Sequence, residues 1–173
     1  LKILVVLVIA VAARREFNDP MDGLIYGSMA GLGMAIEESV SLLGGISSVG
    51  SRWLPPEELA RLCGHLVMGG IGSLPLGMAL LRTPGWPIAL ALCPSFAVGL
   101  HFGWDWLALS TPREGWSAGS TAIGIALMLS GLLVYGTLVA LASEWSHRLF
   151  APERPGSLWG WPFDLVRRRR REE

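Results

Sequence analysis

Long apolar blocks separated by short polar segments are the main pattern along this chain of 173 residues. A helix needs about 20 mostly apolar residues to cross a bilayer, and four blocks reach that length: 21–43, 59–81, 86–109 and 119–145. A fifth block, 1–13, is too short to cross, and we interpret it as the second half of a span. The pattern predicts an all-α fold, a polytopic transmembrane helical bundle of four full spans plus a truncated first span.

Composition agrees with this pattern. Hydrophobic residues make up 51% of the chain and charged residues 16%, whereas a soluble domain carries roughly 25% charge. An ordinary soluble domain is therefore excluded. The two cysteines, Cys63 and Cys93, lie far apart and form no C-x-x-C pair, which indicates neither a disulfide framework nor a zinc finger.

Basic residues predict the orientation of the spans. Arg14, Arg15, Arg82 and the C-terminal segment fall on the same side of a chain with these spans. Because positive charge collects on the cytoplasmic side, we expect these residues in the cytoplasm. The chain then divides into a transmembrane helical domain, 1–146, and a basic cytoplasmic tail, 147–173.

The tail ends in a run of arginines, 167–171. Such a run after a span is typical of a stop-transfer anchor that also contacts anionic lipid. We therefore expect the lipid bilayer, and no nucleic acid, as its partner.

Five ionisable residues lie inside the apolar blocks, and a charge at bilayer depth costs at least about 2.5 to 3.5 kcal/mol. A rise of about 1.5 Å per residue places Glu38, His65 and His101 at a similar depth in the outer half of the membrane. Asp105 follows His101 by four residues and shares its helix face. Glu37 points about 100° away from Glu38, so we expect it at the periphery.

Several kinds of chemistry fit this cluster. A carboxylate beside a histidine can activate water, and a histidine with a nearby acid can hold an oxyanion. Glu38, His65 and His101 could instead bind a divalent metal such as zinc. A path for protons or ions is a further possibility, and each residue alone could simply be hydrogen-bonded or solvated. The residues by themselves leave these alternatives open.

The stretch NDPMDGLIYGSMAGLGMAIEES, from Asn18 to Ser39, resembles the signature of the PrsW family of intramembrane proteases, within the CAAX-protease and bacteriocin-processing superfamily. The family pattern is D-x-x-D-G-x-x-Y-G followed by G-x-G-F-A-x-x-E-N. Its matches here are Asp19, Asp22, Gly23, Tyr26, Gly27, Gly31, Gly33, Ala35 and Glu38. Met34 replaces the phenylalanine of that pattern and Ser39 its asparagine.

The later histidine motifs of the family resemble RLCGH, which ends at His65, and HFGWD, which holds His101 and Asp105. The first family motif, E-E-x-x-K, would end at Lys2. We therefore expect its two glutamates just upstream of Leu1, at the same outer depth as the other polar residues.

The resemblance implies an intramembrane endopeptidase that cleaves membrane-anchored proteins in the plasma (inner) membrane of a bacterium, with 1–146 as a protease-like domain. It implies that Glu38, with His65, positions or deprotonates water. His101 and Asp105 would hold the oxyanion or orient the scissile carbonyl. No cofactor is expected, the alternative being a metal-dependent protease with Glu38, His65 and His101 as ligands. A non-catalytic membrane partner or a transporter is the other alternative.

Overall fold

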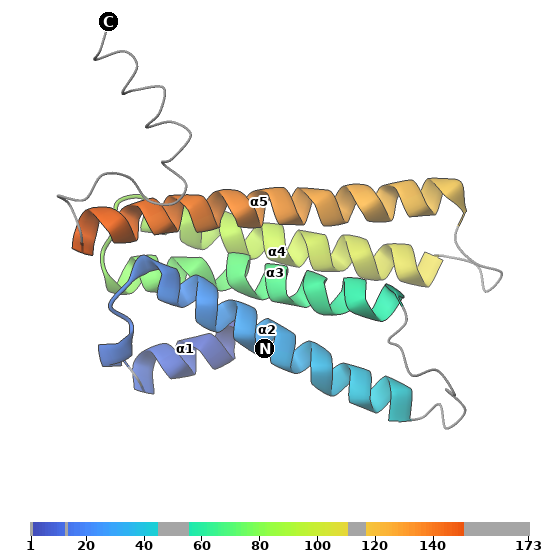
Figure 1. Cartoon of the computed structure of the whole chain (residues 1–173), viewed down its shortest axis with the longest axis horizontal. Helices are drawn as coiled ribbons and strands as arrows, with labels where there is room; N and C mark the ends of the chain where they lie inside the picture. Colours follow the sequence, from blue (N-terminus) through green and yellow to red (C-terminus); the bar gives the residue numbers. More distant parts are fainter. Residues whose placement is uncertain (1, 13, 45–55, 111–116, 151–173) are drawn as a thin grey trace, which may run out of the picture.

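The computed structural model describes residues 2–12, 14–44, 56–110 and 117–150, and every regular element in these ranges is a helix. Figure 1 shows α3, α4 and α5 side by side, with α2 crossing α3 and the short α1 beside α2. The elements in chain order are α1 (Lys2–Ala12), the 3-10 turn η1 (Arg14–Glu16), α2 (Pro20–Gly44), α3 (Pro56–Leu80), α4 (Trp86–Ser110) and α5 (Ala118–Phe150). The predicted all-α helical bundle is confirmed.

The helices coincide with the predicted blocks. α2, α3 and α4 each have 25 residues and α5 has 33, so each exceeds the roughly 20 residues that a span requires. Three segments are also apolar enough to cross a membrane: Glu58–Leu80, Trp86–Ser110 and Ala118–Phe150. α2 has the length, but acidic residues and many glycines lower its hydropathy, so its crossing stays a prediction.

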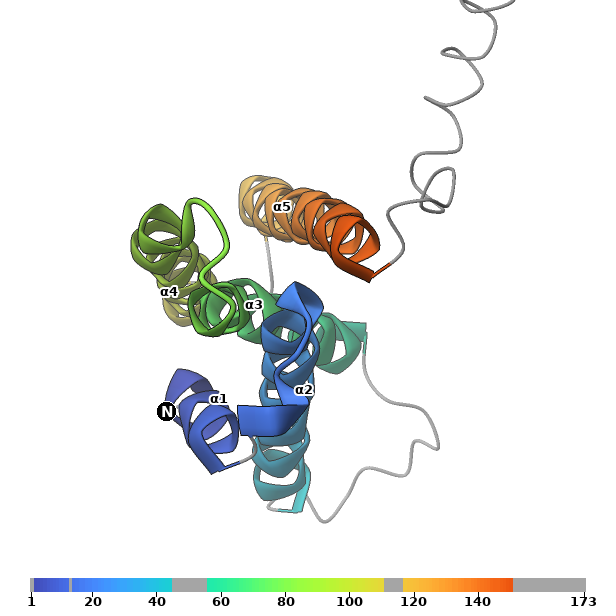
Figure 2. The same cartoon turned by 90° about the vertical axis from the view of Figure 1, so that its left-hand side faces the viewer.

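α3 is the central helix. In its apolar window 61% of the residues are buried, against 6% in α4 and 11% in α5. Ile71 and Leu74 of α3 are almost fully buried, where they pack toward α4, α5 and α2. A smaller cluster of Val6, Ala10 and Phe17 attaches α1 to α2 and α3. Figure 2 views the bundle end-on, with α3 between α2 and the pair formed by α4 and α5.

Glycines bring α2 and α3 into direct backbone contact. A Cβ atom on Gly69 would lie 3.0 Å from the Cα of Gly31, and one on Gly31 would lie 3.2 Å from the Cα of Gly69. Gly27 faces the same part of α3. Small residues permit this close approach of membrane helices, and it fixes how α2 and α3 align along their length.

The start of α2 is a capping box. The Asp19 carboxylate accepts a hydrogen bond from the backbone N–H of Met21 at 2.7 Å, and the Asp22 carboxylate accepts one from the N–H of Asp19 at 2.8 Å. Pro20 occupies the first helical position, where no donor is needed. Ser146 of α5 also donates to Asp19. The two aspartates of the signature stretch therefore start α2, and Asp19 also ties it to α5.

The proposed boundary at 146 falls inside α5, which continues to Phe150. From residue 151 onward, the predicted tail and its arginine run lie outside the described residues. The division into domain and tail stays a prediction.

Candidate active site

Side chains from three helices meet in the half of the bundle where α2 ends and α3 begins. Oε2 of Glu38, from α2, lies 3.7 Å from Nδ1 of His65, from α3. The ring of His65 packs edge-on against that of His101, from α4, with centroids 5.3 Å apart. The predicted proximity of these three residues is confirmed, whereas their catalytic roles stay predictions.

The glycine contact between α2 and α3 places Glu38 beside His65. A Cβ atom on Gly31 would collide with the backbone carbonyl of His65. Glu38 follows Gly31 by seven residues, or two turns, and so lies on the same face of α2. His65 is only 4% exposed. The backbone packing therefore aims the carboxylate at a buried imidazole.

Asp105 joins the cluster through His101. Its Oδ2 lies 3.6 Å from Nε2 of His101, one helical turn earlier in α4. This separation is longer than a hydrogen bond. The other ring nitrogen of His101, Nδ1, is buried, and within the described ranges nothing is hydrogen-bonded to it. Glu37, which was expected at the periphery, is exposed.

Arg61 is the first residue of the RLCGH stretch, but neither it nor its partner Glu58 was among the predicted site residues. Its Nη1 lies 2.7 Å from Oε2 of Glu38, the same oxygen that faces His65. Its Nη2 and Nε lie 2.6 and 3.1 Å from the two carboxylate oxygens of Glu58. Since Arg61 precedes His65 by four residues, the two share one face of α3, and that spacing was the available signal.

Ser39 completes this network. Its hydroxyl donates to the backbone carbonyl of Ala35 at 2.8 Å and also bonds to Glu58. Arg61 donates to the same carbonyl at 2.7 Å and to the Ser39 hydroxyl. Ser39, where the family pattern has asparagine, thus helps to join α2 to the first turns of α3.

Arg61 also bears on the alternative of a metal ion in the cluster. The Glu38 oxygen that faces His65 already carries the guanidinium of Arg61, which occupies the place of a second cation. Across the described part of the chain, no group of three or more His, Cys, Asp or Glu side chains is placed to hold a metal. The metal-dependent alternative, with Glu38, His65 and His101 as ligands, stays a prediction.

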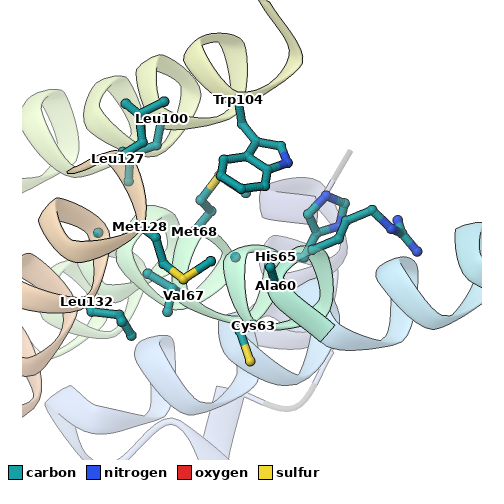
Figure 3. A pocket seen from close by; sticks show the side chains of 13 residues that line it. Ala60, Cys63, His65, Val67, Met68, Leu100, Trp104, Leu127, Met128 and Leu132 are labelled. Atoms are coloured by element: carbon teal, nitrogen blue, oxygen red, sulfur yellow. The ribbon is translucent and has the colours of Figure 1, made fainter. Parts of the chain in front are cut away.

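An apolar pocket adjoins the cluster between α3, α4 and α5 (Figure 3). We call it the inner pocket, and its volume is about 50 Å³. Trp104 of α4 projects toward Met68 of α3 across it, and His65 lies at one side. Its lining consists of Ala60, Arg61, Cys63, Gly64, His65, Val67, Met68, Leu100, Trp104, Leu127, Met128, Gly131 and Leu132.

Comparison with known protein families identifies the family to which this chain belongs. The sequence model of a family described as "PrsW family intramembrane metalloprotease" matches residues 1–141. The chain belongs to the PrsW family. The PrsW match spans α1 to α4 and most of α5, and so includes every residue of the cluster. The chain is thus an integral membrane protein from a family of intramembrane peptidases.

One curated relative has a different description. Human sodium-dependent phosphate transport protein 4 is 29% identical over 91 residues, which are 49% of this chain and 22% of that protein. The chain thus spans about a fifth of the length of this relative, and so partial a likeness does not move it out of the PrsW family. No solved structure matches the chain.

Proposed function

We propose that this chain carries the catalytic site of an intramembrane endopeptidase that cleaves membrane-anchored proteins, with water activated by Glu38 and His65. The observation that supports this most directly is the 3.7 Å separation of Glu38 Oε2 and His65 Nδ1. The two atoms are close enough for a single water beside them to hydrogen-bond to both. A water held there would have a base on one side and a buried imidazole on the other.

In the proposed reaction, Glu38 accepts a proton from this water as its oxygen bonds to the scissile carbonyl carbon. The carbonyl oxygen becomes an oxyanion. When the C–N bond breaks, the proton held by Glu38 passes to the leaving nitrogen, which departs as an amine. Glu38 returns to its carboxylate form, and one water has been consumed per bond cleaved.

His101 is the proposed partner of the oxyanion. Its Nδ1 is buried and has no hydrogen-bond partner within the described ranges, while Nε2 faces Asp105. An imidazole N–H is a hydrogen-bond donor, so the ring can direct Nδ1–H at the oxyanion while Asp105 orients it from the other side. In this proposal Asp105 is a positioning residue.

Arg61 is proposed to hold Glu38 in place. Its guanidinium bonds Glu38 and Glu58 together with the Ala35 carbonyl. Charge-assisted bonds of this kind are strong and directional. They leave Glu38 one favoured orientation, with Oε2 toward His65.

We further propose that the protein lies in a bacterial plasma (inner) membrane with its C-terminal tail in the cytoplasm. The start of α2, the end of α3 and the end of α5 lie at one end of the bundle (Figure 1). Arg14, Arg82 and Arg148 belong to that end, and positive charge favours the cytoplasmic side. The cluster then lies toward the outer side.

The experiment compares new N termini of membrane proteins in host cells that produce the full-length gene product or its variants. Terminal-labelling proteomics should detect a set of cleaved membrane proteins with the wild type. The set should disappear with Glu38→Gln, His65→Ala or His101→Ala. Glu37→Gln is the matched control, because it removes the adjacent but exposed carboxylate, and it should leave the set intact. Persistence of the set in all three site variants would overturn the proposal.

Transport is the second candidate, supported by the partial likeness to a phosphate transport protein. The same variants separate the two functions. Solute flux that is abolished by Glu38→Gln, in cells where no peptide bond is cleaved, would favour transport.

A further inference from the structure

A second apolar pocket adjoins the inner one. This outer pocket lies between α4 and α5, has a volume of about 180 Å³, and is lined by Trp104, Thr121, Gly124, Ile125, Met128 and Leu129. Trp104 and Met128 also line the inner pocket. The two pockets therefore share these two side chains as a common wall, with the outer pocket at the α4–α5 boundary and the inner pocket at the face of α3 that carries His65.

The surface around the outer pocket faces the bilayer. Only 6% of the apolar window of α4 and 11% of that of α5 is buried. Both helices pack on α3 and touch each other (Figure 2). In a membrane, the outer pocket is thus open to apolar chains that approach from the lipid.

The lining of the inner pocket excludes a charged occupant. Arg61 is the charged member of that lining, and its guanidinium is already hydrogen-bonded to Glu38, Glu58 and the Ala35 carbonyl. Most of the remaining lining is aliphatic or thioether, and Met68 and Met128 can adapt their shape. An uncharged, apolar group is therefore the complementary ligand.

The volume limits the size of that group. One water needs about 10 to 15 Å³ of such space, so about 50 Å³ accommodates only a few non-hydrogen atoms. A valine or leucine side chain is of this size, whereas an aromatic ring or a whole lipid tail is larger.

We propose that a transmembrane segment of the substrate approaches through the outer pocket, between α4 and α5, and places one small apolar side chain in the inner pocket. This inference rests on the proposed function, because the pocket would hold a residue next to the scissile bond at His65. The side chains around Trp104 and Met128, rather than the polar cluster, would then select the substrate.

The test is photo-crosslinking, which reports binding without cleavage. The probe is a synthetic single-span peptide of leucine and alanine with one central photo-leucine. It is reconstituted in phosphatidylcholine vesicles with full-length protein that carries Glu38→Gln. We expect labelled peptides that contain Met68 and Met128. The wild-type protein is tested for cleavage of the same peptide in parallel. Labelling of the Glu38→Gln protein without cleavage by the wild type would contradict only the proposed hydrolysis, and cleavage by the wild type without such labelling would contradict only the pocket.

Two glycines of α5 supply matched variants. A Cβ atom on Gly131 would lie 3.2 Å from Cδ1 of Leu100 and 3.5 Å from Cγ1 of Val67, whereas one on Gly136 would meet open space. Gly131→Leu should therefore fill the inner pocket and reduce labelling at least fivefold. Gly136→Leu should leave labelling unchanged.

If Gly131→Leu does not fold, a variant that enlarges the inner pocket tests the proposal instead. Met128→Ala should increase labelling by a peptide with benzoylphenylalanine relative to one with photo-leucine. Equal labelling in wild type and in a folded Gly131→Leu protein would overturn the proposal. So would labelling of Met68 and Met128 by photoreactive phosphatidylcholine but not by the peptide, because the pocket would then be a lipid site.

Discussion

Nη1 of Arg61 lies 2.7 Å from Oε2 of Glu38, the oxygen that also faces Nδ1 of His65 at 3.7 Å. The carboxylate is thus held between a permanent cation and an imidazole. The Arg61 side chain is 16% exposed and the Glu38 side chain 43%, so water reaches this ion pair from the Glu38 side and screens it in part. The proposed base therefore owes its orientation to the first residue of the RLCGH stretch, whose last residue is His65.

Replacement of Arg61 should reduce turnover rather than substrate binding. With Arg61→Gln, Glu38 loses its fixed orientation, and a misplacement of about 1 Å can cost about a hundredfold in rate. We expect kcat to fall by about that factor with KM little changed. Arg61→Lys should recover part of the loss, because it restores the charge but not the planar fork.

The matched control for Arg61 is Arg148→Gln, which breaks the exposed pair between Arg148 and Glu144 at 2.9 Å. Cleavage rates of a substrate found by the terminal-labelling experiment should stay within about twofold of wild type, since exposed pairs contribute little. A wild-type kcat for Arg61→Gln would show that Arg61 does not position the base.

Asp105 should affect cleavage through His101. Its side chain is 55% exposed and its oxygen lies 3.6 Å from the ring, so solvent screening limits its effect. We expect Asp105→Asn to lower kcat by about tenfold and Asp105→Glu to restore most of that rate. Asp105 would have no positioning role if the two variants were equally impaired, or if Asp105→Asn in a His101→Ala background caused a further tenfold loss.

Chelation should leave cleavage intact. Arg61 occupies the Glu38 oxygen that faces His65, and a permanent cation there disfavours a metal ion on the same oxygen. We expect the rate to remain within about twofold after dialysis against a strong chelator, with metal content measured by mass spectrometry. Loss of activity that zinc restores would show that Arg61 leaves Glu38 and that a metal takes its place.

The backbone contact at Gly31 should be intolerant of any side chain. A Cβ atom there collides with the His65 carbonyl, whereas one on Gly33 meets open space. Gly31→Ala should reduce stability by about 1 to 3 kcal/mol through overpacking. Gly33→Ala should leave stability unchanged or raise it slightly, because alanine favours the helix. Thermal unfolding in one detergent checks both, and equal midpoints would refute the close contact.

The sequence predicts the helices well, because long apolar blocks leave little choice in a bilayer. Each predicted full span has a helix within a few residues of its expected bounds. Glu38, His65 and His101 could also be found, since ionisable side chains are costly in such surroundings. Depth along each helix was sufficient to predict that they meet.

Arg61 and Glu58 were not found in this way. Both lie near the start of α3, where a charge is expected at the membrane boundary and suggests no site. Their contact with Glu38 and Ser39 depends on how α2 and α3 are rotated about their own axes. The glycine contact sets that rotation, and apolar periodicity is a poor guide in helices so rich in glycine. The pockets beside α4 could not be predicted either, because their shape also depends on how the helices are rotated.

The backbone contact between α2 and α3 also bears on how the protein behaves in detergent. Gly27, Gly31 and Gly69 place main chain against main chain, where weak Cα–H···O contacts and dispersion act without any lipid between the helices. An alkyl chain finds no space there, so the geometry of Glu38 and His65 should survive extraction. The outer pocket between α4 and α5, in contrast, is open to an alkyl chain. Detergents with short alkyl tails should therefore act on this protein as competitive inhibitors.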